Sequence, residues 1–261
     1  MKKLLPAFFI LLSSTTFAQS NSKSNGSGYF GIGILAGVPI AEFGTYNEDM
    51  AIGVGLNFFY QPSDDIPVMV GLDLGFMGNG NNIQNEVIYA EIKVGETVID
   101  EIQFPFRIET HNSIFAGHFV LRAVAPIKYF KPYVDGIVGF NNFSTNTSIY
   151  DESEEHYFSE ADNPLITTAS QNSDWTFSYG GAAGILVQCG ESFFIDLRCA
   201  YAIGGEADYY VEDDIEDWEV EFTTTPTGTD DLNEDDIAIS AIPKHSETTM
   251  LMPSLGVTFK F

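Results

Sequence analysis

Residues 192–204 read SFFIDLRCAYAIG, a stretch in which large apolar side chains occupy every second position. Successive side chains of a β-strand point to opposite faces, so this alternation predicts a strand with one apolar face. The apolar face carries Phe193, Ile195, Leu197, Cys199, Tyr201 and Ile203. The other face carries Phe194, Asp196, Arg198, Ala200, Ala202 and Gly204. A sheet of such strands would be apolar on one side and lined by small or charged side chains on the other.

The same alternation recurs in seven other stretches of the chain. The eight predicted strands are Tyr29–Ile40, Ala51–Gln61, Val68–Gly78, Ser113–Ala125, Pro132–Thr145, Trp175–Gln188, Ser192–Gly204 and Thr248–Phe261. Each is long enough to cross a bilayer at a tilt, which takes about 9–11 residues. No stretch reaches the ~20 consecutive apolar residues of a spanning helix, so any membrane crossing would be made by strands.

The connections between the strands alternate in length. The short ones are Pro62–Pro67, Pro126–Lys131 and Cys189–Glu191. The long ones are Ala41–Met50, Asn79–Asn112, Asn146–Asp174 and Gly205–Glu247. Short turns on one rim and long loops on the other are typical of bacterial outer-membrane barrels. We therefore predict an all-β fold, an eight-stranded antiparallel up-and-down transmembrane β-barrel with short periplasmic turns and long extracellular loops.

A soluble barrel of the lipocalin type would place the same apolar faces inside, so the second face of the strands decides between the two. A water-exposed face favours Lys, Glu and Thr, because glycine weakens strands. That face here is mostly Gly and Ala, which indicates a narrow, filled interior and a lipid-facing exterior. Aromatic residues next to the short turns are expected to form a girdle at that rim. They are Phe58, Phe59, Tyr60, Tyr129, Phe130, Tyr133, Phe193, Phe194, Phe259 and Phe261.

The N-terminal stretch has a basic start, an apolar run at Leu4–Leu12 and the small-residue pattern Thr16-Phe17-Ala18. This layout predicts a secretory signal peptide cleaved after Ala18. The predicted division of the chain is a signal peptide at 1–18, a short periplasmic segment at 19–28 and an outer-membrane β-barrel domain at 29–261. The expected location is the outer membrane of a Gram-negative bacterium.

The chain is strongly acidic, with 37 Asp and Glu residues against 11 Lys and Arg residues and a formal net charge of −26. Most of the acidic residues lie in two segments, Asp151–Asp162 and Glu206–Asp236. Such a surface repels phosphate groups, so the composition excludes nucleic acid as a partner.

Three short segments resemble the family of bacterial outer-membrane β-barrel domains, namely the PorT-like barrels and the OmpA- and OmpX-type eight-stranded barrels. They are Gly37–Gly44 (GVPIAEFG), Lys131–Val134 (KPYV) and Gly256–Phe261 (GVTFKF). The last resembles the terminal signal read by the outer-membrane assembly machinery, with Phe259 and Phe261 as its aromatic residues. The resemblance implies a fold and a location, and for PorT-like members a role in surface assembly or secretion.

The strand parity predicts that several ionisable side chains point into the barrel. They are Asp73, His118, Arg122, Asp135, Asp196, Arg198 and Lys260. Three acids would face three permanent cations, and buried charges need partners. An eight-stranded barrel is just wide enough for side chains to fill, so we predict a salt-bridged plug. The alternative is an ion path gated by those pairs, which would make the protein a small gated pore.

His118 raises an enzymatic alternative, because some eight-stranded outer-membrane proteins are lipid A-modifying enzymes with a His and a Ser at the barrel wall. Ser113 and Ser178 are present, but no motif links either to His118 or to His111. We therefore predict a structural, hydrogen-bonded histidine, no catalytic residue and no enzyme activity.

The loop Asn79–Asn112 contains a hairpin pattern of its own. Apolar side chains alternate at Ile88, Ala90, Ile92 and Val94 before a turn at Gly95-Glu96, and again at Ile102, Phe104, Phe106 and Ile108. We predict a hairpin that projects above the membrane. Its open edge, within residues 85–108, could pair with a strand of a partner protein. The alternative is an extension that has only a structural role.

The loop 205–247 carries clustered carboxylates that are weak candidates for a Ca²⁺ site. They are Asp213, Asp214, Glu216, Asp217, Asp230, Asp231, Glu234, Asp235 and Asp236. No EF-hand spacing and no glycine-rich nonapeptide repeat occur among them. The usual meaning of such a run is a solvated, repulsive loop, so no cofactor is expected.

These expectations together describe a non-enzymatic outer-membrane protein with a filled lumen that acts as a structural or interaction scaffold through its extracellular loops. Its expected partners are outer-membrane lipid and lipopolysaccharide, the outer-membrane assembly machinery and a protein bound at the loop hairpin.

Overall fold

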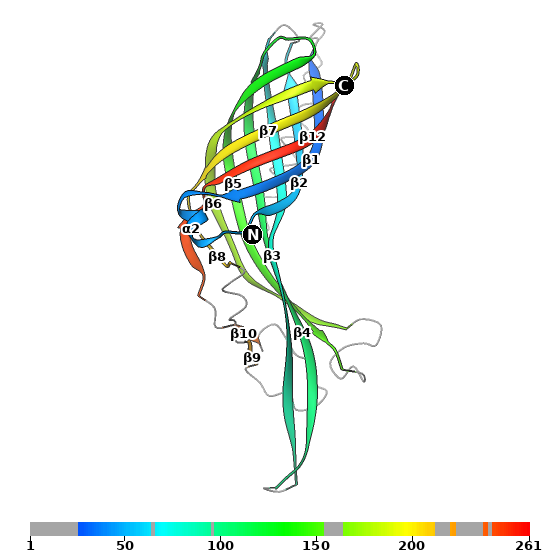
Figure 1. The fold of residues 1–261 in the computed structure, drawn as a ribbon, viewed down its shortest axis with the longest axis vertical. Helices are drawn as coiled ribbons and strands as arrows, with labels where there is room; N and C mark the ends of the chain where they lie inside the picture. Colours follow the sequence, from blue (N-terminus) through cyan, green and yellow to red (C-terminus); the bar gives the residue numbers. More distant parts are fainter. Residues whose placement is uncertain are drawn as a thin grey trace, which may run out of the picture.

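The structure is a closed barrel of eight antiparallel strands (Figure 1). The computed structural model describes residues 26–63, 66–94, 97–153, 164–211, 220–222, 237–239 and 242–261. The barrel strands are β1 (Ser27–Pro39), β2 (Ala51–Gln61), β3 (Val68–Val94), β4 (Thr97–Val124), β5 (Phe130–Asp151), β6 (Leu165–Gln188), β7 (Phe193–Gly204) and β12 (Met250–Lys260). Each pairs with its neighbours along the chain, and β12 closes the ring on β1. The predicted all-β fold, an eight-stranded antiparallel up-and-down barrel, is confirmed.

Four of the strands are longer than the alternation predicted. β3 and β4 have 27 and 28 residues, and β5 and β6 have 22 and 24. The predicted hairpin within 79–112 is the direct continuation of β3 and β4, with a register shift between Gly78 and Asn81. Its predicted turn at Gly95-Glu96 lies outside the described residues. Figure 1 shows this hairpin extending well beyond the rest of the barrel.

The predicted loop Asn146–Asp174 was wrong in extent, because β5 and β6 both run into it. The reason is polar cross-strand pairing, which apolar alternation does not reveal. The hydroxyl oxygens of Thr110 and Thr147 lie 3.1 Å apart, and those of Ser148 and Thr168 lie 3.0 Å apart. These side chains hold together a stretch of sheet that carries few apolar residues.

The alternation of inward and outward side chains follows the prediction. Along β7, Leu197, Cys199 and Tyr201 are exposed while the residues between them are buried. The rim aromatics divide between the two faces. Tyr60, Tyr129, Phe130 and Phe259 are exposed, but Phe59, Tyr133 and Phe194 are buried in the interior. The predicted girdle is therefore smaller than expected, because three of its aromatic residues pack inside the barrel.

Short elements cover the opening of the barrel opposite the short turns. They are α2 (Ala41–Tyr46) and the paired strands β8 (Glu206–Tyr209) and β11 (Lys244–Glu247). Two further strands, β9 (Val220–Phe222) and β10 (Ile237–Ile239), pair with each other. Among the described residues, no helix is long and apolar enough to cross a bilayer.

Three aromatic side chains pack together at this opening. Phe43 of α2 is fully buried, and its ring meets those of Phe143 and Tyr209 edge-on at centroid distances of 5.6 and 4.8 Å. Edge-to-face aromatic contacts of this kind add to the stabilisation from area burial. We call Phe43, Phe143 and Tyr209 the aromatic lid. The lid brings together α2, β5 and β8, so it fixes loop elements onto the barrel.

Candidate functional site

The centre of the barrel interior holds a buried pair of opposite charges. Arg122 of β4 and Asp135 of β5 lie directly opposite each other in the strand register. Arg122 donates from Nε to Oδ1 of Asp135 at 2.8 Å and from Nη2 to Oδ2 at 3.0 Å. The Arg122 side chain is 2% exposed and the Asp135 side chain 0%. A two-pronged contact of this kind fixes geometry as well as charge.

Two aromatic rings enclose the guanidinium of Arg122. Its Cζ lies 4.1 Å from the ring centroid of Phe59 and 3.6 Å from that of Tyr133. Cation–π contacts are strongest where water is excluded, as it is here. The Tyr133 hydroxyl in turn donates to Oδ1 of Asp196 at 2.5 Å. The two inward aromatic residues therefore hold the charged groups in place.

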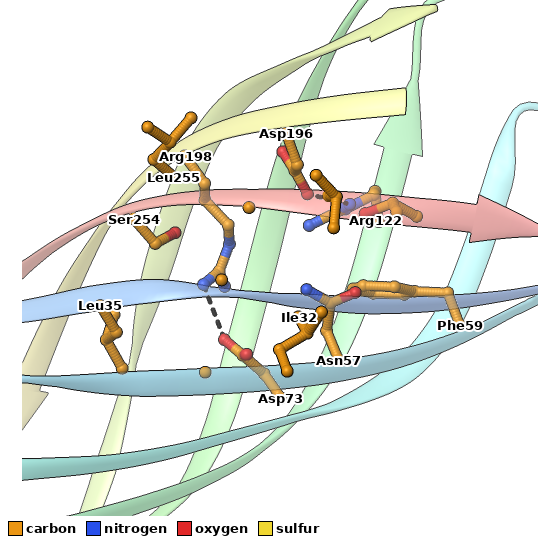
Figure 2. A pocket seen from close by; sticks show the side chains of 15 residues that line it. Ile32, Leu35, Asn57, Phe59, Asp73, Arg122, Asp196, Arg198, Ser254 and Leu255 are labelled. Carbon is orange, nitrogen blue, oxygen red and sulfur yellow. Dashed lines mark hydrogen bonds and ion pairs between the residues drawn. The ribbon is translucent and has the colours of Figure 1, made fainter. Parts of the chain in front are cut away.

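A second arginine, Arg198 of β7, joins the remaining acids. Its Nε donates to Oδ2 of Asp135 at 2.9 Å, and its Nη1 donates to Oδ2 of Asp73 at 2.6 Å. Figure 2 shows Arg198 reaching across the lumen toward Asp73, with Arg122 and Asp196 beside them. Nη1 of Arg122 lies 3.6 Å from Oδ2 of Asp196. We call Asp73, Arg122, Asp135, Asp196 and Arg198 the lumen ion network.

The lumen ion network connects strands on different sides of the barrel, since its members come from β3, β4, β5 and β7. Every charge in it has an opposite charge within 4.0 Å, which offsets the cost of removing it from water. The free space beside the network is a cavity of about 30 Å³. Such a volume has room for two or three water molecules, at about 10–15 Å³ each. The network thus places paired charges from four strands in the barrel interior.

This small cavity is polar on one side. Nη2 of Arg198, Oδ1 of Asn57 and Oγ1 of Thr258 are buried atoms without a hydrogen-bond partner among the described residues. All three side chains line the cavity. Buried water usually occupies sites with two to four such polar partners, so the cavity suits ordered water.

The predicted hydrogen bond of His118 has Ser178 as its partner, which the sequence did not identify. Its Nε2 lies 3.0 Å from Oγ of Ser178, and both residues are buried in the interior. In the strand register His118 of β4 pairs with Gly139 of β5, which pairs with Ser178 of β6. The imidazole therefore reaches from β4 across β5 to β6. Only the register could have identified this pair, and Ser113 bonds elsewhere, to Ser144.

Lys260 occupies a different place from the other predicted lumen charges. It pairs in register with Tyr29 near the short-turn rim, and its ammonium lies 5.8 Å from the Tyr29 ring centroid. The expectation of three cations facing three acids is therefore wrong in this detail. Two arginines, and not three cations, hold Asp73, Asp135 and Asp196 together in the centre.

The terminal aromatic residues lie on the outer surface at the same rim. Phe259 is exposed and packs on Phe193 at a ring-centroid distance of 5.4 Å. The backbone N–H of Phe261 donates to the carbonyl of Gly28 at 2.9 Å, which continues the pairing that closes the barrel.

The acidic residues singled out as weak Ca²⁺ candidates in the loop 205–247 all lie outside the described residues, as does the predicted signal peptide. Within the described part of the chain, no group of three or more His, Cys, Asp or Glu side chains is placed to hold a metal ion.

No family model matches the chain, and no curated protein matches its sequence. Several solved structures resemble it. Ail, the attachment invasion locus protein of Yersinia pestis, was solved with the heparin analogue sucrose octasulfate. It shares 12% identity over 90% of this chain and 99% of its own, with a TM-score of 0.42. The outer membrane protein OprG from Pseudomonas aeruginosa shares 12% identity over 90% of this chain and 96% of its own, with a TM-score of 0.39. Neisserial surface protein A shares 9% identity over 90% of this chain and 96% of its own, with a TM-score of 0.37.

Proposed function

We propose that the protein is an integral β-barrel of a Gram-negative outer membrane. The supporting observation is that apolar side chains lie on the outer face of the barrel and charged side chains on the inner face, the reverse of a soluble protein. Large apolar side chains are exposed around the outside, among them Ile34 at 64%, Phe119 at 67% and Val134 at 60%, while charged groups lie inside. In water, so continuous an apolar surface would drive association, whereas acyl chains solvate it.

Within that membrane the protein serves as a non-enzymatic scaffold with a filled lumen. The lumen ion network and the aromatic lid block the interior at two levels, which supports a structural role over a pore. Outer-membrane lipid and lipopolysaccharide are the proposed surroundings of the barrel, and the assembly machinery inserts it by its terminal strand. The similarity of Gly37–Gly44, Lys131–Val134 and Gly256–Phe261 to PorT-like barrels supports surface assembly or secretion as the process it serves.

The β3–β4 hairpin is the proposed site for a protein partner. The pairing of β2 with β3 ends at Ile52 and Gly78, and beyond this point β4 is the strand of the described residues that pairs with β3. On the other side, the register of β4 with β5 begins at Phe106 and Asp151. The hairpin extends past the ends of its pairing with β2 and β5, and the proposed partner adds an extended segment along it as a further strand.

Conductance across a planar bilayer tests the filled lumen. The refolded protein should give no steady single-channel steps, while a wide porin refolded in the same way serves as the positive control. Steady steps of reproducible size would overturn the scaffold proposal in favour of a small gated pore. Material that stays monodisperse in buffer without detergent would overturn the membrane location itself.

Photo-crosslinking in intact cells tests the hairpin. A photoreactive residue at Val87, which is exposed on the hairpin, should give a discrete protein adduct. The matched control is the same residue at Phe119, which is exposed on the barrel wall and should contact lipid. The same adducts at both positions, or none at Val87, would count against a partner at the hairpin.

The proposed absence of enzyme activity is tested at His118. Because its hydrogen bond to Ser178 lies inside the barrel, the pair has no access to lipid. Replacement His118→Asn should leave the lipid A of the host unchanged, as judged by mass spectrometry. A change in acylation that depends on both His118 and Ser178 would revive the lipid A-modifying alternative.

A further inference from the structure

A second cavity opens at the short-turn end of the barrel. Its volume is about 390 Å³, within the range of roughly 300–1,000 Å³ that is usual for small-molecule sites. Met69, Val124, Leu186 and Phe194 form its apolar inner wall, and Lys128 and Lys131 also line it. We call this cavity the rim cup.

The rim cup is closed at its inner end. Met69 pairs in register with Arg122, so the lumen ion network begins directly beyond the apolar wall. The four apolar wall residues are themselves tightly packed, with exposed fractions between 1% and 8%. A molecule entering from the rim would therefore stop against packed side chains and would not pass into the lumen.

The charge of the rim cup is opposite to that of the protein as a whole. The Lys131 ammonium lies 5.1 Å from the ring centroid of Phe194, and that of Lys128 lies 5.2 Å from the ring centroid of Tyr129. None of the residues lining the cavity is acidic. Two of the 11 basic residues of a chain with a net charge of −26 thus gather at one apolar cavity.

We propose that the rim cup binds a single-chain amphiphilic anion. Its acyl chain would lie against Met69, Leu186 and Phe194, and its carboxylate or phosphate head would meet Lys128 and Lys131. An apolar wall removes the chain from water, and the ammonium groups supply charge-assisted hydrogen bonds to the head group. The head group is the element that selects the ligand, since a cationic amphiphile of equal length would meet like charge. This binding site is separate from the scaffold role proposed above.

Equilibrium binding to the full-length protein in phosphatidylcholine nanodiscs tests the site, with empty nanodiscs measuring partition into lipid alone. The probes are radiolabelled dodecanoate, dodecyl phosphate and dodecyltrimethylammonium. Both anions should bind saturably above the empty-disc level, and the cation should not. Tighter binding of dodecyl phosphate would identify a phospholipid fragment as the source, and tighter binding of dodecanoate a free fatty acid.

Matched variants distinguish binding in the rim cup from non-specific attraction of anions to lysine side chains. The double replacement Lys128→Gln and Lys131→Gln should weaken anion binding about tenfold, as expected for losing a hydrogen bond to a charged group. Lys244→Gln, on β11 near the opposite opening, should leave binding unchanged. Ile127→Trp places a large ring at the cavity from an exposed turn position and should reduce the number of bound anions while the barrel stays folded.

Three results would overturn the proposal. They are anion uptake no greater than in empty nanodiscs, equal affinity in the double variant and in Lys244→Gln, and equal binding of the cationic probe. Circular dichroism of each variant in nanodiscs establishes that the barrel is intact, so that loss of binding is not loss of fold.

Discussion

Tyr133 and Gly184 lie opposite each other on β5 and β6, and the tyrosine ring occupies the space that a side chain at Gly184 would fill. A Cβ atom added at Gly184 would lie 2.4 Å from both Cζ and the hydroxyl oxygen of Tyr133. This close approach lets the ring lie across β6, where it covers Arg122 and reaches Asp196. The position of the lumen ion network therefore depends on a residue that carries no charge.

Replacement Gly184→Ala should lower the free energy of unfolding by about 1–3 kcal/mol, because the Tyr133 ring must shift and lose its contacts. Gly136→Ala is the matched control, since nothing lies within 4 Å of a Cβ added there. Urea unfolding in lipid vesicles measures both. Equal unfolding midpoints for the two variants would contradict the close packing of Tyr133 against Gly184.

Replacement Asp135→Asn removes the carboxylate that Arg122 and Arg198 share. Breaking a buried pair leaves charge without compensation, so we expect a loss of about 3–5 kcal/mol in unfolding free energy. Glu86→Gln, at an exposed position on the β3–β4 hairpin, should change the same measurement little. A variant as stable as the wild type would mean that Asp135 is not the centre of the network.

Replacement Phe43→Ala removes the central ring of the aromatic lid. Truncation of a fully buried phenylalanine costs about 3–5 kcal/mol where the site cannot collapse. Here the loss should appear locally, as faster proteolysis between Ala41 and Met50, because α2 is held to β5 and β8 by this ring. Tyr46→Ala, at an exposed position in the same helix, is the control. Unchanged proteolysis of Phe43→Ala would show that other contacts hold α2.

The pairing of β8 with β11 should depend on pH through His245. The hydrogen bond between His245 Nδ1 and Asp208 Oδ1, 2.7 Å long, raises the pKa of His245 above its ordinary value of 6.5, and Glu206 at 3.5 Å adds to this. Because the pKa is raised in the folded state, the stabilisation that protonated His245 gives to the pairing of β8 with β11 is fully present below the ordinary pKa. This stabilisation is lost as the pH rises through the raised pKa.

Amide hydrogen exchange in β11, corrected for the intrinsic pH dependence of exchange, measures this effect. Protection in wild-type β11 should fall across the titration of His245, and His245→Gln should abolish the dependence. Added salt should reduce the effect, since the group is fully exposed. A pH dependence that persists in the variant would assign it to another group.

The sequence located the barrel strands well because a single physical period governs them. One face of each strand meets an apolar surrounding and the other meets a packed interior, so the alternation marks both the strand and its inward residues. Asp73, Asp135 and Arg198 could be placed inside on this basis alone. The ends of β5 and β6 could not be found, because Thr147 and Ser148 pair through hydroxyl groups and carry no apolar period.

Partners within the interior could not be derived from parity. Parity states which face a residue occupies, but the register between strands decides which residues meet. His118 and Ser178 are 60 positions apart and meet because both lie opposite Gly139 in the strand register. Lys260 has the correct parity but lies too near the short-turn rim to serve with Arg122. The sequence pattern did not give the position of each residue along the barrel axis, which separates Lys260 from Arg122.

The unequal lengths of the strands give the barrel an uneven rim at the end opposite the short turns. β3, β4, β5 and β6 have 22 to 28 residues, whereas β1, β2, β7 and β12 have 11 to 13. The half of the barrel wall with long strands and the half with short strands, where α2 joins β1 to β2, therefore have different outer surfaces. In the membrane location that we propose, a neighbouring molecule in the bilayer would therefore meet a different surface at each half of the barrel.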